Sequence, residues 1–160
     1  MGRSRLMLIF GIGILVLPAA TPRSQQTSLP TFTDIAKQAG IDFVHSFGDE
    51  ELSTIVEATG AGCGLFDYDN DGDLDVYLLN GCYMKGLSNP RSRHLEGKVT
   101  NRLYRNDGDY TFTDVTEEAG VGDKGFAMAC VAADYDNDND IDLLITNYGP
   151  NTFYRNNGDG

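Results

Sequence analysis

Two short segments, residues 74–79 and 141–146, are apolar at nearly every position and rich in Val, Ile and Leu. A strand with one face in water alternates apolar and polar residues, whereas a continuous apolar run of this length is typical of a strand buried on both faces. Both segments are therefore predicted to be inner strands of a sheet.

A hairpin is predicted close to the first of these strands. Residues 104–115 (YRNDGDYTFTDV) alternate in polarity on either side of Asn106-Asp107-Gly108, which is a strong turn signal. Together with the segment that precedes the inner strand, this pattern predicts a unit of about four strands, at residues 60–66, 74–79, 102–105 and 111–115.

The same motifs recur in the same order, which marks an internal repeat. Residues 31–35 with 39–41 match 111–115 with 119–121, residues 67–80 match 134–147, and residues 101–109 match 151–159. The offsets of 80, 67 and 50 residues place two insertions in the first copy, at about 42–54 and 81–97. Four-stranded units at this spacing predict an all-β fold of β-propeller blades over residues 31–160, whereas a β-sandwich would share the three ordered motifs only by accident.

Two such units cannot close a ring, because a propeller needs at least four blades. The second copy reaches residue 160 at the turn that leads, in the first copy, into the outer strand, so we expect it to lack that strand. Residues 31–35 are then a candidate outer strand of the final blade. The chain is expected to hold about two blades of an incomplete propeller.

The N-terminal 20 residues have the features of a secretory signal peptide. Two arginines precede an apolar run of about 12 residues, at 6–17, and small residues follow as far as Ala20. The run is short for a bilayer span, so we expect cleavage near Ala20, with an uncleaved membrane anchor as the alternative. The polar residues 21–30 are predicted to be a linker. A secreted or extracytoplasmic protein follows, with no membrane insertion after cleavage.

The charge balance excludes one class of partner. With 24 acidic against 12 basic residues, a formal charge of −12 and a pI of about 4.3, the chain should repel nucleic acid. Its 41% hydrophobic content is too high for an acidic disordered tail. Residues 91–105 are a basic exception, either a solvated loop or a site for an acidic glycan or protein, and contain Arg91, Arg93, Lys98, Arg102 and Arg105 against Glu96.

Export would permit disulfides, but three cysteines cannot all pair within one chain. Cys63 and Cys130 occupy equivalent positions of the repeat, which favours a packing role. We therefore expect small buried residues with free thiols, and a bridge between Cys63 and Cys82 across neighbouring strands stays open as the alternative.

The strongest chemical signal is the pair of acidic loops at residues 67–75 (DYDNDGDLD) and 134–142 (DYDNDNDID). Carboxylates at loop positions 1, 3, 5 and 9 can converge with the position 7 carbonyl, and Ca²⁺ takes six to eight such oxygens. Gly72 permits a sharp turn at position 6, and Asn139 is the next most tolerant residue there. Position 12 is Leu78 or Ile145 instead of Glu, so an EF-hand is not expected, and Mg²⁺ is second choice because it demands small octahedral geometry. The candidate metal ligands are Asp67, Asp69, Asp71, Asp73, Asp75, Asp134, Asp136, Asp138, Asp140 and Asp142.

With these loops and the motifs LYRNDGD and TFTDVTEEAGV, the chain resembles the FG-GAP or VCBS repeat proteins, whose propeller is that of the integrin α-subunit head. The resemblance covers about residues 31–160 and looks closest to secreted bacterial cartilage-acidic-protein-like proteins, which often carry an ASPIC/UnbV segment further on. It implies a seven-bladed ring of about 400 residues. It also implies Ca²⁺ ligation by carboxylates of both loops, with backbone carbonyls from Asp73 and Asp140.

No catalytic constellation is recognisable in the sequence. The two histidines, His45 and His94, fall in the insertions without nucleophile or zinc-ligand spacing around them. We therefore expect a non-enzymatic, Ca²⁺-stabilised adhesion or recognition module for an extracellular protein or glycan. The alternative is a module of a polysaccharide-acting enzyme, because related propellers occur in some carbohydrate lyases.

Overall fold

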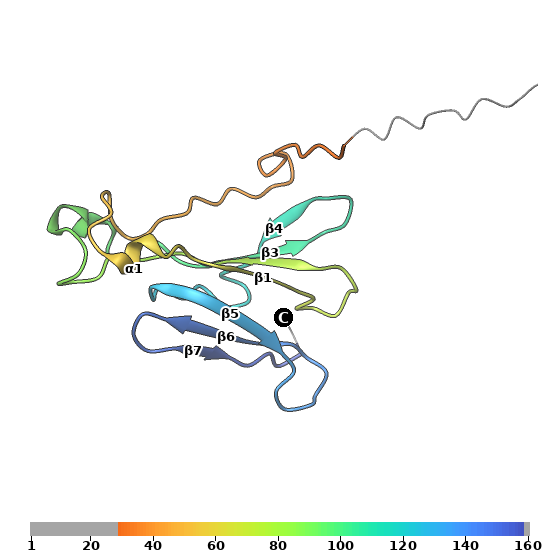
Figure 1. Cartoon of the computed structure of the whole chain (residues 1–160). Coiled ribbons are helices and arrows are strands. Elements are labelled where there is room, and N and C mark those ends of the chain that lie inside the picture. The colour runs from red at the N-terminus through yellow and green to blue at the C-terminus, as the bar shows by residue number, and fades with distance from the viewer. Residues whose placement is uncertain (1–28, 159–160) are drawn as a thin grey trace, which may run out of the picture. The chain divides into compact units, whose positions relative to one another are not determined.

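The computed structural model describes residues 29–158, and the part from Asp34 onward forms two antiparallel sheets (Figure 1). The first sheet consists of β1 (Cys63–Phe66), β2 (Asp75–Leu78), β3 (Arg102–Asn106) and β4 (Phe112–Asp114). The second consists of β5 (Ala127–Ala133), β6 (Asp142–Asn147) and β7 (Thr152–Tyr154). Within residues 29–158, helical structure is limited to α1 (Ile55–Ala58) and a 3₁₀ helix, η1 (Pro90–Leu95). The predicted signal peptide and residues 21–28 of the linker lie outside the described residues.

Each sheet is a meander in which consecutive strands pair, in the order β1-β2-β3-β4 and β5-β6-β7. The predicted four-stranded unit and its hairpin are confirmed, with Asn106 opposite Phe112 in the β3–β4 ladder. In the second unit, the described residues form three strands. The chain is therefore all-β and built from sheets of the propeller-blade type.

The core lies between the two sheets, which approach each other through β1 and β5 (Figure 1). Gly64 permits this approach, because a Cβ atom there would lie 2.9 Å from the Cys130 Sγ. The fully buried Tyr77 donates its hydroxyl to the Val121 carbonyl at 2.6 Å, and burial raises the pKa of this phenol. The core residues are Phe66, Tyr77, Leu79, Leu103, Val115, Ala127, Leu143 and Ile145.

The predicted burial of the inner strands on both faces is wrong within the described residues. Along β2, buried residues alternate with half-buried ones. Leu65 and Val131, on the flanking strands β1 and β5, are 62% and 57% exposed. The second face of the first sheet is covered only in part, since Tyr104 is buried there while Leu65 keeps contact with solvent.

Residues 31–35 form no strand among the described residues, so their role as the outer strand of the final blade in a closed ring stays a prediction. The cysteines are free, as expected, and the alternative Cys63–Cys82 bridge is not formed. However, Cys63 is exposed because it opens the edge strand β1, while Cys82 and Cys130 are half-buried and burial raises the pKa of both thiols.

The two insertions fold against each other into one feature, called here the insertion lobe (residues 42–54 and 81–97). Phe47 forms a parallel bridge with Gly81, whose N–H donates to the Ser46 carbonyl at 2.7 Å. Gly81 is needed for this approach, because a Cβ there would lie 2.8 Å from the Phe47 Cα. Segments about 35 residues apart in sequence are thereby joined at one end of the first sheet.

A buried carboxylate, Asp49, holds the insertion lobe together. It accepts hydrogen bonds from the Ser92 hydroxyl and from the backbone N–H groups of Asn89 and Glu50, the last at 2.7 Å. Asp49 is 5% exposed and Ser92 is fully buried. Burial by itself raises the pKa of Asp49, but these hydrogen bonds outweigh it and lower the pKa from 3.8 to about 2.

We predict that Asp49→Asn destabilises the protein by about 1–3 kcal/mol, because the donors around a charged, buried acceptor lose part of their partner. The folded-state pKa lies below that of the unfolded chain, so this stabilisation is complete above about pH 4 and is lost as the pH falls towards 2. Urea denaturation between pH 7 and pH 2 measures both effects. Glu51→Gln, an exposed change of the same charge in the same loop, is the control. Equal stability losses for the two variants would contradict the role of Asp49.

Candidate metal centre

The two acidic loops connect β1 to β2 and β5 to β6, at equivalent places in the two sheets. In the first loop the carboxylates of Asp67, Asp69 and Asp71 come together, each offering an oxygen within 4.8 Å of the others. In the second loop the same holds for Asp134, Asp136 and Asp138. The structure thus brings together six of the ten predicted ligands in two matching groups.

Hydrogen bonds from the loop backbone to its own carboxylates produce this convergence. Asp67 accepts the N–H groups of Asp71 and Gly72 at 3.1 and 3.0 Å. Asp71 in turn accepts the N–H of Asp73 at 2.8 Å. The second loop repeats all three bonds at 3.0–3.2 Å. An aspartate that accepts from a later N–H in this way folds the chain back on itself, so alternate side chains turn to one centre.

Left-handed backbone conformations occur where the sequence predicts them. Gly72 has φ 94° and Asn139 has φ 76°, which confirms the expected turn at position 6 of both loops. Asn70 and Asn137 also adopt positive φ, at 60° each, and sequence reasoning missed them. The signal was present, since asparagine tolerates this conformation and stands at position 4 of both copies.

The position 9 aspartates lie outside the two carboxylate groups and are buried. One Asp75 oxygen accepts the Tyr68 N–H at 2.9 Å and the other accepts the Asn106 N–H at 2.8 Å. Asp142 makes the equivalent bonds with Tyr135 and Asn156 at 3.1 and 2.9 Å. Each carboxylate therefore joins its loop to the next hairpin. For Asp73 and Asp140 the sequence predicts only a backbone carbonyl as ligand.

Charge crowding perturbs these acids. Burial raises the pKa of Asp75, and the negative charges of Asp69 and Asp71 raise it further, against two lowering backbone hydrogen bonds. Burial and the charge of Asp138 likewise raise the pKa of Asp136. Both shifts show that a nearby positive charge would stabilise the ionised loop.

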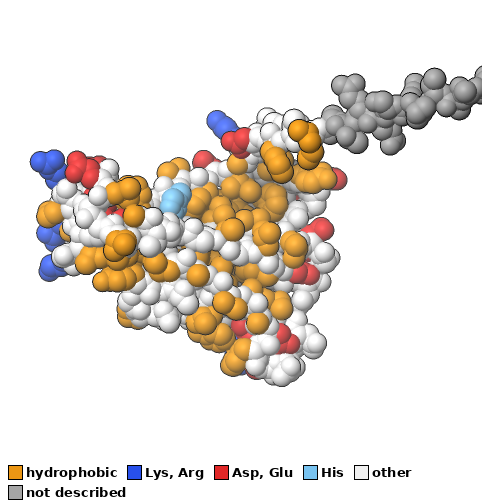
Figure 2. Space-filling view, viewed as in Figure 1, with side chains coloured by type: hydrophobic (Ala, Val, Ile, Leu, Met, Phe, Trp, Pro, Cys, Tyr) orange, Lys and Arg blue, Asp and Glu red, His pale blue; other side chains and the backbone are white. Residues whose placement is uncertain are grey.

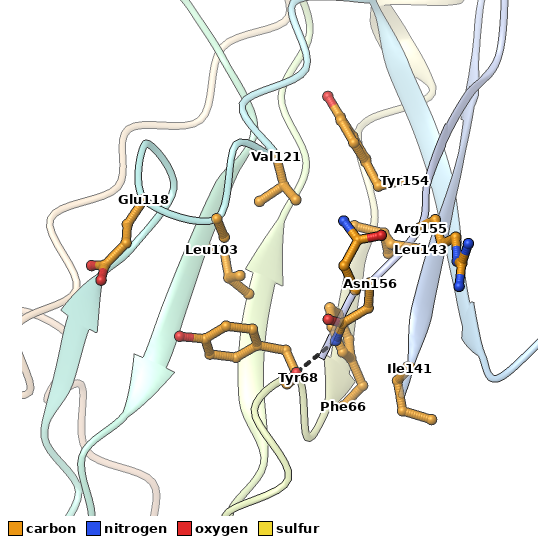
Figure 3. A pocket seen from close by; sticks show the side chains of 12 residues that line it. Phe66, Tyr68, Leu103, Glu118, Val121, Ile141, Leu143, Tyr154, Arg155 and Asn156 are labelled. Carbon is orange, nitrogen blue, oxygen red and sulfur yellow. Dashed lines mark hydrogen bonds between the residues drawn. The ribbon is translucent and has the colours of Figure 1, made fainter. Parts of the chain in front are cut away.

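The two loops lie next to each other across the sheets. The Asn70 side-chain amide donates to the Asp140 carboxylate at 2.8 Å, and the Asn156 amide donates to the Tyr68 carbonyl at 2.8 Å. Figure 3 shows the second bond at the edge of a cavity of about 310 Å³ between the sheets, with Leu103 and Tyr154 among its lining residues. Hydrogen bonds from side-chain amides therefore connect the two loop regions.

Two arginines of the repeat, Arg105 and Arg155, lie near the loops, which the sequence does not predict. Arg155 contacts Asp136 at 3.1 Å and Asp138 at 3.4 Å. Its equivalent, Arg105, contacts Asp107 at 2.8 Å instead. Their equivalence could be read from the motif YRN in both copies, but their partners could not.

The donor sets suit a hard cation. Each group offers three carboxylates, which together carry more negative charge than one divalent ion neutralises, and it lies on a strongly turned backbone. Ca²⁺ and Mg²⁺ both prefer oxygen ligands of this kind. In the second loop, the Arg155 guanidinium lies against two of these carboxylates and neutralises part of their charge.

Residues 67–145 match the model of the FG-GAP-like repeat. The match begins at the first ligand position of the first loop and ends in β6, so it includes both loops. No curated protein matches the chain. The described residues include no helix with the length and apolar composition that a membrane crossing requires.

We predict that Gly72→Ala destabilises the first loop by about 1–2 kcal/mol, because a side chain disfavours φ 94°. Open space surrounds the added Cβ, so the cost comes from the backbone alone. Gly72→Asn should cost less, since Asn139 adopts the same conformation in the second loop, and Asn139→Gly should be neutral or slightly stabilising. Urea denaturation compares the three variants. A Gly72→Ala protein as stable as the wild type would show that this turn is unimportant.

Proposed function

We propose that the chain is a secreted, calcium-binding β-propeller repeat module that recognises an extracellular protein or glycan. The observation that carries the proposal is the repetition of one convergent carboxylate loop at equivalent positions of two sheets. The match to an FG-GAP-like repeat over the same residues supports it.

The role proposed for Ca²⁺ is structural. Both loops lead directly into the inner strands β2 and β6. Their converging carboxylates repel one another unless a positive charge lies nearby. A bound Ca²⁺ would neutralise them and hold the hairpin closed. Ligation would use the converging carboxylates first, with the carbonyls of Asp73 and Asp140 completing the set.

Secretion is proposed from the N-terminal pattern of residues 1–20, and extracellular Ca²⁺ would be available to such a protein at millimolar concentration. The proposal includes a relationship to the secreted cartilage-acidic-protein-like proteins that the sequence resembles. A non-enzymatic role fits the histidines, since the exposed His94 lies 3.5 Å from Glu50 and the exposed His45 has no nucleophile or metal-ligand spacing around it.

We predict that Ca²⁺ stabilises the protein by about 0.5–1.5 kcal/mol per loop at millimolar concentration, because extracellular modules bind it at about 0.1–1 mM. Calorimetric titration and thermal melts with chelator, Ca²⁺ or Mg²⁺ provide the measurement. Asp69→Asn and Asp136→Asn should each remove one site. Asp109→Asn, an exposed change of equal charge outside the loops, should remove neither. Identical melts with chelator and Ca²⁺ would rule out the metal role.

The proposed recognition surface lies beside the insertion lobe, where Figure 2 shows Lys and Arg side chains gathered at one end of the molecule. Of the basic cluster predicted from the sequence, Arg93, Arg102 and Arg105 form ion pairs. Lys98, for which the described residues offer no ion pair, lines a surface hollow with Lys124, Arg102 and Glu117. This excess of positive charge on an acidic protein suits an acidic glycan.

We predict that Lys98→Ala/Lys124→Ala weakens binding to sulfated or uronic-acid glycans by about three- to tenfold, through loss of two charge contacts. The control is Lys37→Ala, which removes a positive charge from an exposed position outside the insertion lobe. A glycan array followed by titration of the best ligand gives the affinities. If the double variant binds like the wild type, the hollow is not the recognition site.

A further inference from the structure

The two loops are equivalent in sequence, yet their arginines make different contacts. Arg155 lies against the carboxylates of its own loop, at 3.1 Å from Asp136 and 3.4 Å from Asp138. Arg105, which occupies the same position of the first unit, makes no ion pair with the first loop among the described residues. One loop therefore already has a cationic side chain at its ligands, and the other does not.

The two units also differ in sequence at the position two residues after each arginine. In the first unit it is Asp107, which binds Arg105 through both Nε and Nη2 at 2.8 Å. The second Asp107 oxygen accepts the hydroxyl of Thr113 on β4, so the acid is held in place. Hydrogen bonds from Thr113 and Arg105 lower the pKa of Asp107, which keeps it charged.

The equivalent residue in the second unit is Asn157, a neutral amide. An amide offers a guanidinium no charge, whereas the three loop carboxylates do. Arg155 accordingly turns to the loop. The exchange of one carboxylate for an amide thus changes which acids the arginine neutralises.

We propose that Asp107 and Asn157 set the cation affinity of the two loops by directing the neighbouring arginine away from the first loop and into the second. The inference rests on the proposed calcium function. Calcium entering the second loop must displace or tolerate the fixed charge of Arg155, and arginine cannot escape by losing a proton. The first loop is the tighter site, and the second is partly neutralised by the protein itself.

The test is calorimetric Ca²⁺ titration of the full chain with one loop disabled at a time. Asp69→Asn/Asp71→Asn leaves only the second loop, and Asp136→Asn/Asp138→Asn leaves only the first. We expect the first loop to bind at least about threefold more tightly than the second. In the background that keeps the second loop, Arg155→Gln and Asn157→Asp should each tighten binding by about three- to tenfold.

Asn157→Asp retains the arginine, so it tests the inference even where Arg155→Gln folds poorly. In the background that keeps the first loop, Asp107→Asn should weaken binding by releasing Arg105. The matched control is Arg102→Gln, which removes the same charge from a residue paired with Asp114 outside both loops and should change neither affinity.

The outcomes separate the inference from the function on which it rests. The inference would be overturned if the two loops bound Ca²⁺ with equal affinity and neither Arg155→Gln nor Asn157→Asp changed it. Calcium binding itself would then stand. A tightening of both loops by Arg102→Gln to the same extent would also overturn it, as an effect of net charge alone. An absence of Ca²⁺ binding in the wild type and in every variant would refute the proposed function itself.

Discussion

Each sheet depends on one buried carboxylate that satisfies two backbone N–H groups from different segments. Asp75 and Asp142 stand at the first position of an inner strand and are almost fully buried. One oxygen accepts from the acidic loop, and the other accepts from the last residue of the neighbouring strand, Asn106, or from the turn after it, Asn156. An unpaired buried charge would be costly, so these bonds fix the loop and the next hairpin relative to the strand. Within that framework, the hydrogen bonds inside each loop bring its carboxylates together.

Motifs that depend on neighbouring residues could be predicted from the sequence. The turn at Asn106-Asp107-Gly108, the inner strands and the left-handed position at Gly72 all follow from local rules of backbone conformation and periodicity. The grouping of alternate aspartates follows as well, because the loop is only nine residues long. The repeat strengthened each of these predictions, since two copies carry the same pattern.

Features that depend on contacts between distant segments could not be predicted. Asp49 meets Ser92 across 43 residues, and no pattern in the sequence marks either residue. The different partners of Arg105 and Arg155 depend on which acid lies within reach of a long side chain. The partial burial of the second sheet face depends on what covers the sheet, which hydrophobicity alone does not show. Residues 31–35 likewise form no strand among the described residues, since a strand needs a partner.

A repeated asparagine bond closes the inner hairpin in both sheets. The Asn80 N–H donates to the Asn101 side chain at 2.7 Å, across 21 residues, and the Asn147 N–H donates to the Asn151 side chain at 3.0 Å, across four. Lengthening the connection by this ratio costs only about 1.5 kcal/mol of closure entropy. The pairing of the two strands therefore does not depend on the length of the segment that connects them. The segment between these asparagines can change in length and sequence, and with it the outer surface, while the strands keep their register.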